Sequence, residues 1–147
     1  MRFPRTIRLD DSDPQSFAHA AEPGEWAVSG AFVFSDRDAA RLAAKERQAF
    51  RGGFLGTGSF GWSSTVVVAE ITPDEHEAAI EALTHHLLEH FDAPDHASAR
   101  TFAEEEVAFA ASLCDRPINT IIGVERSFGP QGIVERFRVI ERTNPDR

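Results

Sequence analysis

The chain has 147 residues, of which 41% are hydrophobic and 27% charged, and its formal net charge is −9. The length predicts one domain over residues 1–147, and the acidic composition argues against a general nucleic-acid-binding protein. A single cysteine excludes an internal disulfide, no stretch approaches the roughly 20 apolar residues of a membrane span, and the first residues lack the apolar run of a signal peptide. We therefore expect an acidic, soluble, cytoplasmic protein that contacts neither membranes nor nucleic acids.

The first half of the chain contains four segments with strand or helix patterns. Alternating apolar residues predict an edge strand over Phe3–Leu9, and large side chains on one face predict a second strand over Trp26–Ser35. Good helix formers predict a helix over Ala39–Phe50, which ends before Gly52. The β-branched residues of Trp62–Ile71 predict a central strand covered on both faces.

Two capping boxes mark the starts of two helices in the second half. Thr72 and Pro73 open a helix that runs to about Phe91. The second box predicts a helix from Thr101 to Cys114.

The last two apolar segments predict a β-hairpin. They cover Thr120–Phe128 and Ile133–Glu141 and flank the turn Gly129–Gly132. The resulting order of elements contains only one strand–helix–strand unit that could give a parallel pair of strands. We therefore expect an α+β fold, a two-layer sandwich of a mostly antiparallel sheet with about five strands and about three helices on one face.

Charge is unevenly distributed along the chain. From Glu70 to Asp115 there are twelve acidic residues and one basic residue, Arg100, which gives this segment a net charge of −11. The segment from Arg37 to Arg51 has a net charge of +3. Charge segregated in this way steers protein partners toward one another.

A glycine-rich segment follows the basic stretch. Gly56, Gly58 and Gly61 have the GxGxxG spacing of dinucleotide-binding loops, which follow a strand and open a helix. Here the glycines follow a predicted helix and lead into a predicted strand, which favours a helix-to-strand connection. Glycine also lets a ligand or partner approach the backbone closely, so Gly58 and the adjacent Trp62 are candidate ligand contacts.

Two arginines next to this segment are candidates for binding an anion. Arg47 and Arg51 lie four residues apart, on one face of the predicted helix. Arginine binds carboxylate or phosphate through two donors, which suggests an anion pocket between these side chains and the glycines. The alternative is a solvated surface, or a surface that pairs with the acidic helices of the same or another chain.

Glu106 interrupts an apolar face. The apolar face predicted for its helix consists of Phe102, Phe109, Ala110 and Leu113. A carboxylate on a core-facing position must be paired, hydrogen-bonded or protonated, and a raised carboxyl pKa often marks a functional site. Glu106 is therefore a candidate catalytic residue; the alternative is a structural ion pair with an arginine of the hairpin. The possible partners are Arg126, Arg136 and Arg138.

Two histidines and the single cysteine complete the candidates. His86 and His90 lie at i and i+4 on one helix, a spacing that can bind one metal ion, although no third ligand is evident. The alternative is a histidine-rich, pH-sensitive helix flank. Cys114 lies at a helix C-terminus beside Asp115, where both the helix dipole and the carboxylate disfavour a thiolate, so we expect a small buried side chain.

Four segments together cover much of the chain and resemble a small bacterial protein family of unassigned function. They are Ala21–Phe34, Lys45–Gly56, Ser59–Val68 and Ala103–Pro117. The resemblance implies one full-length domain, and it implies no activity, cofactor or catalytic residue.

Three functional hypotheses follow. The leading one is a non-catalytic cytoplasmic binding or accessory module that acts through protein–protein contacts, uses no cofactor and self-associates as a homo-oligomer through a sheet edge or the acidic helices. The second is a small-molecule site or hydrolase-like enzyme centred on Glu106, with His86, Arg47 and Arg51 around it. The third is a metal site at His86 and His90.

Overall fold

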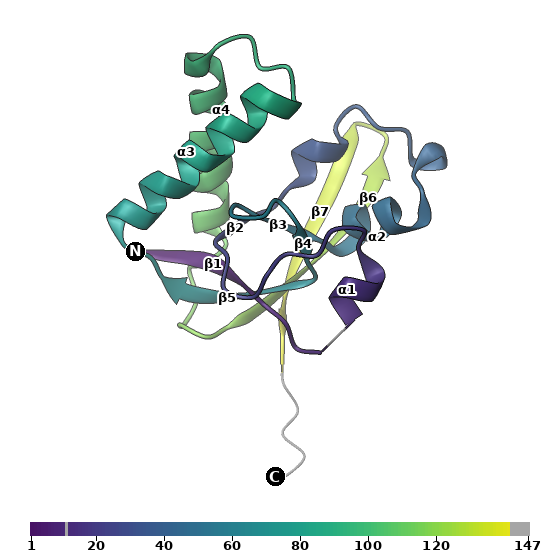
Figure 1. The fold of residues 1–147 in the computed structure, drawn as a ribbon. Coiled ribbons are helices and arrows are strands. Elements are labelled where there is room, and N and C mark those ends of the chain that lie inside the picture. Colours follow the sequence, from purple (N-terminus) through teal and green to yellow (C-terminus); the bar gives the residue numbers. More distant parts are fainter. Residues whose placement is uncertain (11, 142–147) are drawn as a thin grey trace.

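The computed structural model describes residues 1–10 and 12–141, and Figure 1 shows its fold. The strands are β1 (Arg2–Ile7), β2 (Ala27–Val28), β3 (Phe54–Gly56), β4 (Trp62–Ser63), β5 (Thr65–Glu70), β6 (Ile121–Gly129) and β7 (Gly132–Ile140). The α-helices are α1 (Ser12–Ser16), α2 (Ala44–Gly52), α3 (Pro73–His90) and α4 (His96–Ser112), and two 3-10 helices, η1 and η2, cover Ala31–Phe34 and Ala39–Arg41. Across the described residues, none of the helices combines the length and the apolarity that a membrane crossing requires.

The α+β class and the antiparallel pairing of strands are confirmed. Within the described residues the strands divide between two sheets, a four-stranded sheet in the order β1-β5-β6-β7 and a three-stranded sheet in the order β2-β3-β4, where the sequence predicted one sheet of about five strands. The helices also separate: α3 packs on α4, while α2 lies apart from them against β6 (Figure 1).

The strand predicted over Trp26–Ser35 is wrong beyond Val28. Gly30 adopts a left-handed conformation with φ +83, after which the chain forms η1. A Cβ at Gly30 would lie 2.7 Å from the Trp62 ring, so both the conformation and the close packing require glycine. The chain therefore leaves the sheet at this point and carries the aromatic residues of η1 away from it.

Two other predicted elements are divided in the structure. The helix predicted over Ala39–Phe50 becomes η2 and α2, because Leu42 is extended and buried between them and Glu46 accepts a hydrogen bond from the N–H of Ala43 (3.2 Å) at the start of α2. The strand predicted over Trp62–Ile71 is interrupted at Ser64, whose hydroxyl donates to Asp13 of α1 (2.7 Å).

The long helix α3 and the hairpin β6–β7 match their predictions closely. Thr72 caps α3 as predicted, with a hydrogen bond from the N–H of Glu75 to its hydroxyl (3.1 Å). The start predicted for the next helix at Thr101 is wrong, because α4 begins at His96 with Asp95 as its N-cap. The hydroxyl of Thr101 instead donates to a carbonyl within the helix.

The buried side chains form three clusters. The largest lies between α3, α4, β1 and the small sheet; the second lies between β3, β5 and β6; and the third surrounds α2. Val66 and Val68 of β5 are buried in the second cluster, whereas Val67 is half-buried.

Candidate functional site

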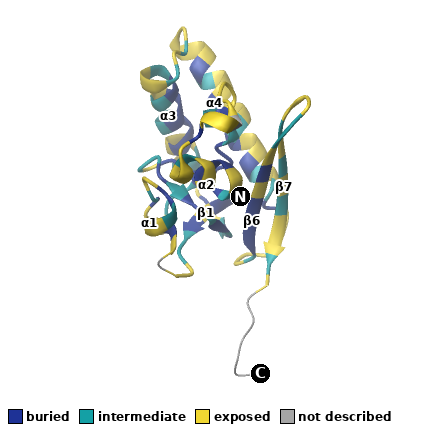
Figure 2. Cartoon of the chain, turned by 90° about the vertical axis from the view of Figure 1, so that its right-hand side faces the viewer, coloured by how far each residue is buried: buried dark blue, intermediate teal, exposed yellow. Residues whose placement is uncertain are grey.

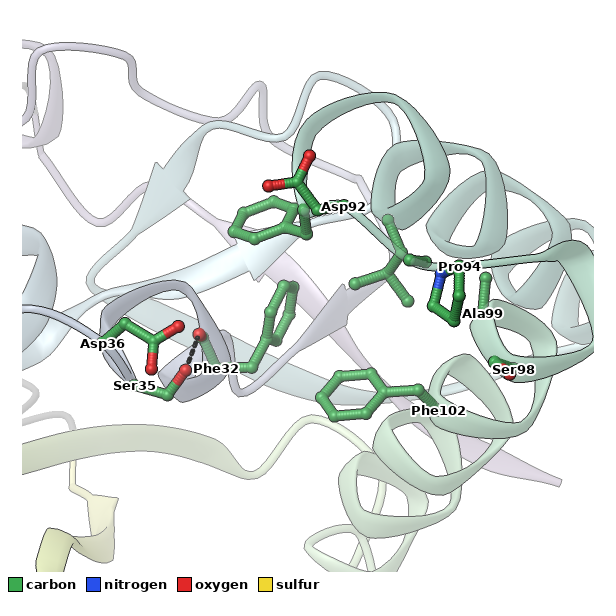
Figure 3. A pocket seen from close by; sticks show the side chains of 11 residues that line it. Phe32, Ser35, Asp36, Asp92, Pro94, Ser98, Ala99 and Phe102 are labelled. Atoms are coloured by element: carbon green, nitrogen blue, oxygen red, sulfur yellow. Dashed lines mark hydrogen bonds between the residues drawn. The ribbon is translucent and has the colours of Figure 1, made fainter.

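A pocket of about 360 Å³ lies between η1 and the turn that joins α3 to α4. We call it the phenylalanine pocket, because Phe32, Phe91 and Phe102 contribute most of its aromatic lining. Figure 3 shows the ring of Phe32 from η1 and the ring of Phe102 from α4 lying next to each other in the lining of this space. Pro94 and Ala99 line it from the helix turn and from α4.

Local backbone structure holds these side chains in place. Below Phe32, the hydroxyl of Ser35 donates to the Phe32 carbonyl (3.0 Å) and closes η1, as the dashed line in Figure 3 shows. At the other wall, Phe91 is the C-cap of α3, and its N–H still donates to the carbonyl of Leu87 (3.0 Å). Asp92 then adopts a left-handed conformation with φ 55 and turns the chain toward α4.

The three phenylalanine rings form one aromatic unit. Phe32 meets Phe91 edge to face with ring centroids 5.2 Å apart, and it meets Phe102 in the same way at 5.6 Å. Phe102 is 39% exposed, a large fraction for a phenylalanine with an aromatic partner. The pocket is therefore open to solvent along the Phe102 side and presents apolar surface there.

Acidic groups surround the opening. Asp36 and Asp92 line the pocket, and both residues are exposed. The one basic residue of the acidic segment, Arg100, donates to Glu77 (2.6 and 2.9 Å) and to Glu81, and these ion pairs raise its pKa. Among the described residues that line the pocket, Asp36 and Asp92 are the charged ones, so the charged groups of the lining are acidic.

The aromatic surface of α4 was not foreseen from the sequence. The predicted apolar face of this helix placed Phe102 and Phe109 in the core, but both are about 40% exposed. The buried face instead consists of Ala99, Ala103, Val107 and Ala110. Small side chains allow α4 to lie close to α3 and to the strands. The alanines of α4 are the sequence feature from which this buried face could have been predicted.

Glu106 lies at the border of the buried face of α4. Burial, followed by the negative charges of Glu135 and Glu105, raises its carboxyl pKa to about 7, and the positive charge of Arg126 opposes that shift. Among the described residues, no basic group forms an ion pair with Glu106 within 4.0 Å. The structure thus brings Glu106 near the arginine named as its possible partner, yet that arginine pairs with Glu135.

The side chain of Arg126 connects three parts of the fold through hydrogen bonds. Its side chain is fully buried, and Nε donates to Glu135 (2.8 Å). Nη1 donates to the carbonyls of Phe50 (3.0 Å) and Gly53 (2.7 Å), at the end of α2, and Nη2 donates to the Ser29 carbonyl. A cation at the carbonyl end of a helix is stabilising, so this side chain ties α2, the β2–η1 connection and the hairpin together.

The residues of the predicted anion site separate into three places. Arg47 and Arg51 line a pocket of about 250 Å³ beside Phe50 and Phe128, to which Arg126 also contributes. Gly58 lies in the β3–β4 turn, and Trp62 is half-buried with its ring against Phe34, 5.4 Å between centroids. Glu106 does not line the Arg47 pocket.

The glycine segment is a turn between two strands, β3 and β4, so the expectation of a preceding helix is wrong. Three donors of this turn bind the carboxylate of Glu25. They are the backbone N–H groups of Gly58 (3.0 Å) and Ser59 (2.7 Å) and the hydroxyl of Ser59 (2.7 Å). Burial opposes ionisation of Glu25, but the hydrogen bonds from Ser59, Glu22 and Gly58 outweigh it and hold the pKa below its usual value. The carboxylate of Glu25 therefore occupies the backbone donors that the glycine spacing had suggested for a bound anion.

His86 and His90 lie side by side, with ring centroids 4.9 Å apart. The His86 ring stacks on Phe60 at 3.7 Å, and burial together with the neighbouring His90 lowers its pKa. In the part of the chain that the structure describes, no group of three or more histidine, cysteine or acidic side chains could hold a metal ion. The geometry therefore supplies two adjacent imidazoles for the metal hypothesis and no third ligand among those residues.

Cys114 is buried, as predicted, with 2% of its surface exposed. Burial raises the pKa of its thiol to about 11, which keeps the sulfur protonated at neutral pH. The thiol is therefore a packing group in the second cluster.

Comparison with known proteins gave one match. A family model described as a family of unknown function (DUF6505) matches residues 1–146. No curated protein and no solved structure matches the chain. The match confirms the resemblance to a family of unassigned function.

Proposed function

The chain belongs to the family of unknown function DUF6505, and from its own geometry we propose that it is a non-catalytic cytoplasmic binding module of a bacterium that acts through protein–protein contacts. The phenylalanine pocket receives an apolar side chain of a partner segment that also carries basic residues. The observation that carries this proposal is the exposed aromatic lining of the pocket, with Asp36 and Asp92 at its opening.

The size and lining of the pocket fit a side-chain anchor. Its volume of about 360 Å³ has room for one large apolar side chain, and the rings of Phe32 and Phe102, which meet edge to face at 5.6 Å, form one aromatic wall for it. Interfaces commonly bind through a few aromatic anchors that fill such pockets, with a polar rim around them. Phe102 is the exposed member and would lose its contact with water on binding.

The charge around the pocket supports a basic partner. The helices α3 and α4 carry most of the segment with a net charge of −11, and the pocket lies at their junction. An acidic surface accelerates encounter with basic partners and repels acidic ones, including nucleic acids.

A second copy of the chain is the alternative partner. The helix α2 offers exposed basic side chains, among them Lys45 and Arg47, which complement the acidic helices of another copy. This contact joins two different surfaces, so it would build a ring or an open chain of molecules. Sedimentation at increasing concentration distinguishes self-association from binding of a different partner.

A synthetic peptide tests the pocket directly. The probe is a helical peptide of about 18 residues with leucine on one face and lysine on the other, and its binding is measured by calorimetry at low and high salt. We expect binding that weakens with salt and that falls by about tenfold or more in Phe102→Ala, since an interface anchor contributes at least about 1.4 kcal/mol.

Matched variants separate the aromatic and the charge contributions. Asp92→Asn removes one charge and keeps a residue that tolerates the left-handed conformation of that position. Ile118→Ala removes an equally exposed apolar side chain outside the pocket and should bind the peptide like the wild type. Equal affinity of Phe102→Ala, Ile118→Ala and the wild type would contradict the proposal.

A further inference from the structure

The strand β7 forms one edge of the four-stranded sheet, and no strand of the described residues pairs with its outer side. It runs for 9 residues, and Figure 2 shows it along one side of the molecule with exposed residues over much of its length. Within residues 1–10 and 12–141, no backbone hydrogen bond joins it to any element except β6. A long edge with unpaired N–H and C=O groups is a template for another strand.

The opposite edge of the same sheet differs in this respect. There β1 is covered by the segment before β2: the N–H of Thr6 donates to Glu25 (2.7 Å), the N–H of Gly24 donates to Thr6 (2.8 Å), and Arg5 and Trp26 form a bridge. The sheet therefore has one covered edge and one open edge. This contrast singles out β7 as the edge available to a partner.

The register of the hairpin shows which β7 amides face outward. Gly129 and Gly132 flank a two-residue turn and form the closing hydrogen-bonded pair. Because the hydrogen-bonding direction alternates along the strand, the N–H groups at positions 133, 135, 137 and 139 point away from β6. Their carbonyls point the same way and complete the free edge.

The side chains of β7 divide between two faces. Glu135 and Phe137 point inward, toward Arg126 and Phe109. Arg136 and Arg138 are exposed on the outer face. Glu125 lies opposite Arg136 across the hairpin, yet the two form no ion pair within 4.0 Å. The outer face of the free edge is therefore basic.

These charges oppose pairing with a second copy of β7 in the three registers that centre on the middle of the strand, at residues 135, 136 and 137. Two antiparallel strands related by a two-fold axis must match residues of the same face, so the register centres on one residue. Centring on Arg136 places two copies of that arginine opposite each other, and centring on Phe137 places Arg136 opposite Arg138. Centring on Glu135 places two carboxylates opposite each other, and like charges directly across a strand pair are destabilising.

We propose that β7 binds an extended acidic segment of another protein as an additional antiparallel strand. The partner's backbone pairs with the outward groups at positions 133–139, and its acidic side chains lie beside Arg136 and Arg138. Main-chain hydrogen bonds supply the affinity, and the arginines select for acidic residues. This surface is separate from the phenylalanine pocket and has the opposite charge.

Two peptides of the length of β7, 9 residues, test the proposal on the full chain. One alternates glutamate with valine and the other alternates lysine with valine, and binding is followed by NMR. We expect the glutamate peptide to bind and to slow hydrogen exchange of the amides of Ile133, Glu135, Phe137 and Val139, while the amides that face β6 change little. The lysine peptide should bind more weakly.

Two variants separate charge from backbone pairing. In Arg136→Glu with Arg138→Glu, affinity for the glutamate peptide should fall by about tenfold or more and preference should shift to the lysine peptide, since two cross-strand pairs change sign. Val139→Pro keeps both arginines and removes one outward N–H without removing a bond to β6, so it should weaken both the binding and the exchange protection.

Three results would overturn the proposal. The first is unchanged exchange of the four outward amides when the glutamate peptide is added at saturating concentration. The second is peptide affinity that neither variant alters. The third is a dimer without peptide whose outward β7 amides are already protected, which would identify a second copy as the occupant.

Discussion

Arg126 and Glu135 form an ion pair in the interior, with 2.8 Å between Nε of Arg126 and Oε2 of Glu135. The arginine side chain is fully buried, and 18% of the glutamate side chain is exposed. The hydroxyl of Ser29 also donates to Glu135 (2.5 Å). These contacts join the hairpin to α2 and to the β2–η1 connection, so their loss should loosen three parts of the fold.

Removal of one partner of this pair should be strongly destabilising. We expect Arg126→Met to lower the free energy of unfolding by about 3–5 kcal/mol, because Glu135 and the carbonyls at the end of α2 lose their partner in a site with little water. Urea denaturation followed by tryptophan fluorescence measures this loss. Arg136→Met is the control on the neighbouring exposed position and should change stability by less than about 0.5 kcal/mol.

The double variant Arg126→Met with Glu135→Met tests the cause. It removes both charges, so it should recover part of the stability lost in Arg126→Met. If Arg126→Met unfolds at the same urea concentration as the wild type, Arg126 does not stabilise the packing of the hairpin on α2.

Glu106 should make stability depend on pH. Its carboxyl pKa of about 7 lies above the ordinary value of 4.5, so the folded state holds a proton that the unfolded state has released. The contribution of Glu106 is therefore fully present below about pH 4.5 and is lost as the pH rises toward 7. We expect Glu106→Gln to lack this loss and to be more stable than the wild type at pH 8 by about 1–2 kcal/mol, a figure reduced for partial exposure of the side chain.

Thermal unfolding at several pH values measures that difference. Glu104→Gln is the control, because Glu104 is exposed on the same helix and its contact with Arg100 is 3.8 Å long. A wild type and a Glu106→Gln variant with parallel pH profiles would show that Glu106 is ionised in the folded protein at neutral pH.

Glu25 should give the opposite dependence of stability on pH. Its pKa lies below the ordinary value of 4.5, so its contribution is fully present above that pH and is lost as the pH falls through the lower pKa of the folded state. We expect Glu25→Gln to cost about 1–3 kcal/mol at pH 7, because the amide replaces an acceptor oxygen facing N–H donors. The difference from the wild type should shrink in acid.

Hydrogen exchange of the amides of Gly58 and Ser59 locates the effect, since both donate to Glu25. These two amides should exchange faster in Glu25→Gln than in the wild type. Glu22→Gln leaves the carboxylate of Glu25 in place and should not change their exchange. Unaltered protection in Glu25→Gln would show that the turn holds its shape without the carboxylate.

Local patterns predicted the elements whose causes are local. The capping box at Thr72 correctly placed the start of α3, and the glycines at 129 and 132 correctly placed the turn of the hairpin. The capping box at Thr101 does not start a helix, because Asp95, six residues earlier, is the cap and its side chain accepts a hydrogen bond from the N–H of Ser98 (2.7 Å). The capping-box pattern selected Thr101, and the Asp95 cap became visible only in the structure.

The candidate site was predicted only in fragments. Helical spacing singled out Glu106 as a perturbed carboxyl and Arg126 as a possible partner, and the charges of Arg126 and Glu135 do act on Glu106 in the folded chain. Sequence patterns missed the role of Glu25, which lies 33 positions before Gly58 and meets it only after the chain has folded. The phenylalanine pocket was also missed, because Phe32 joins it through the left-handed turn at Gly30.

The sequence by itself determined the α+β class, the caps and turns with a local origin, and the separation of charge along the chain, because each depends on residues a few positions apart. Only the tertiary structure decided that the alanines of α4 are buried while Phe102 and Phe109 face solvent, that the strands form two sheets, and that β7 has a free edge among the residues the structure describes. Those outcomes depend on how closely distant segments approach. Whether a helix turns its small or its large side chains inward depends on the space its neighbours leave, which residue spacing along one helix does not encode.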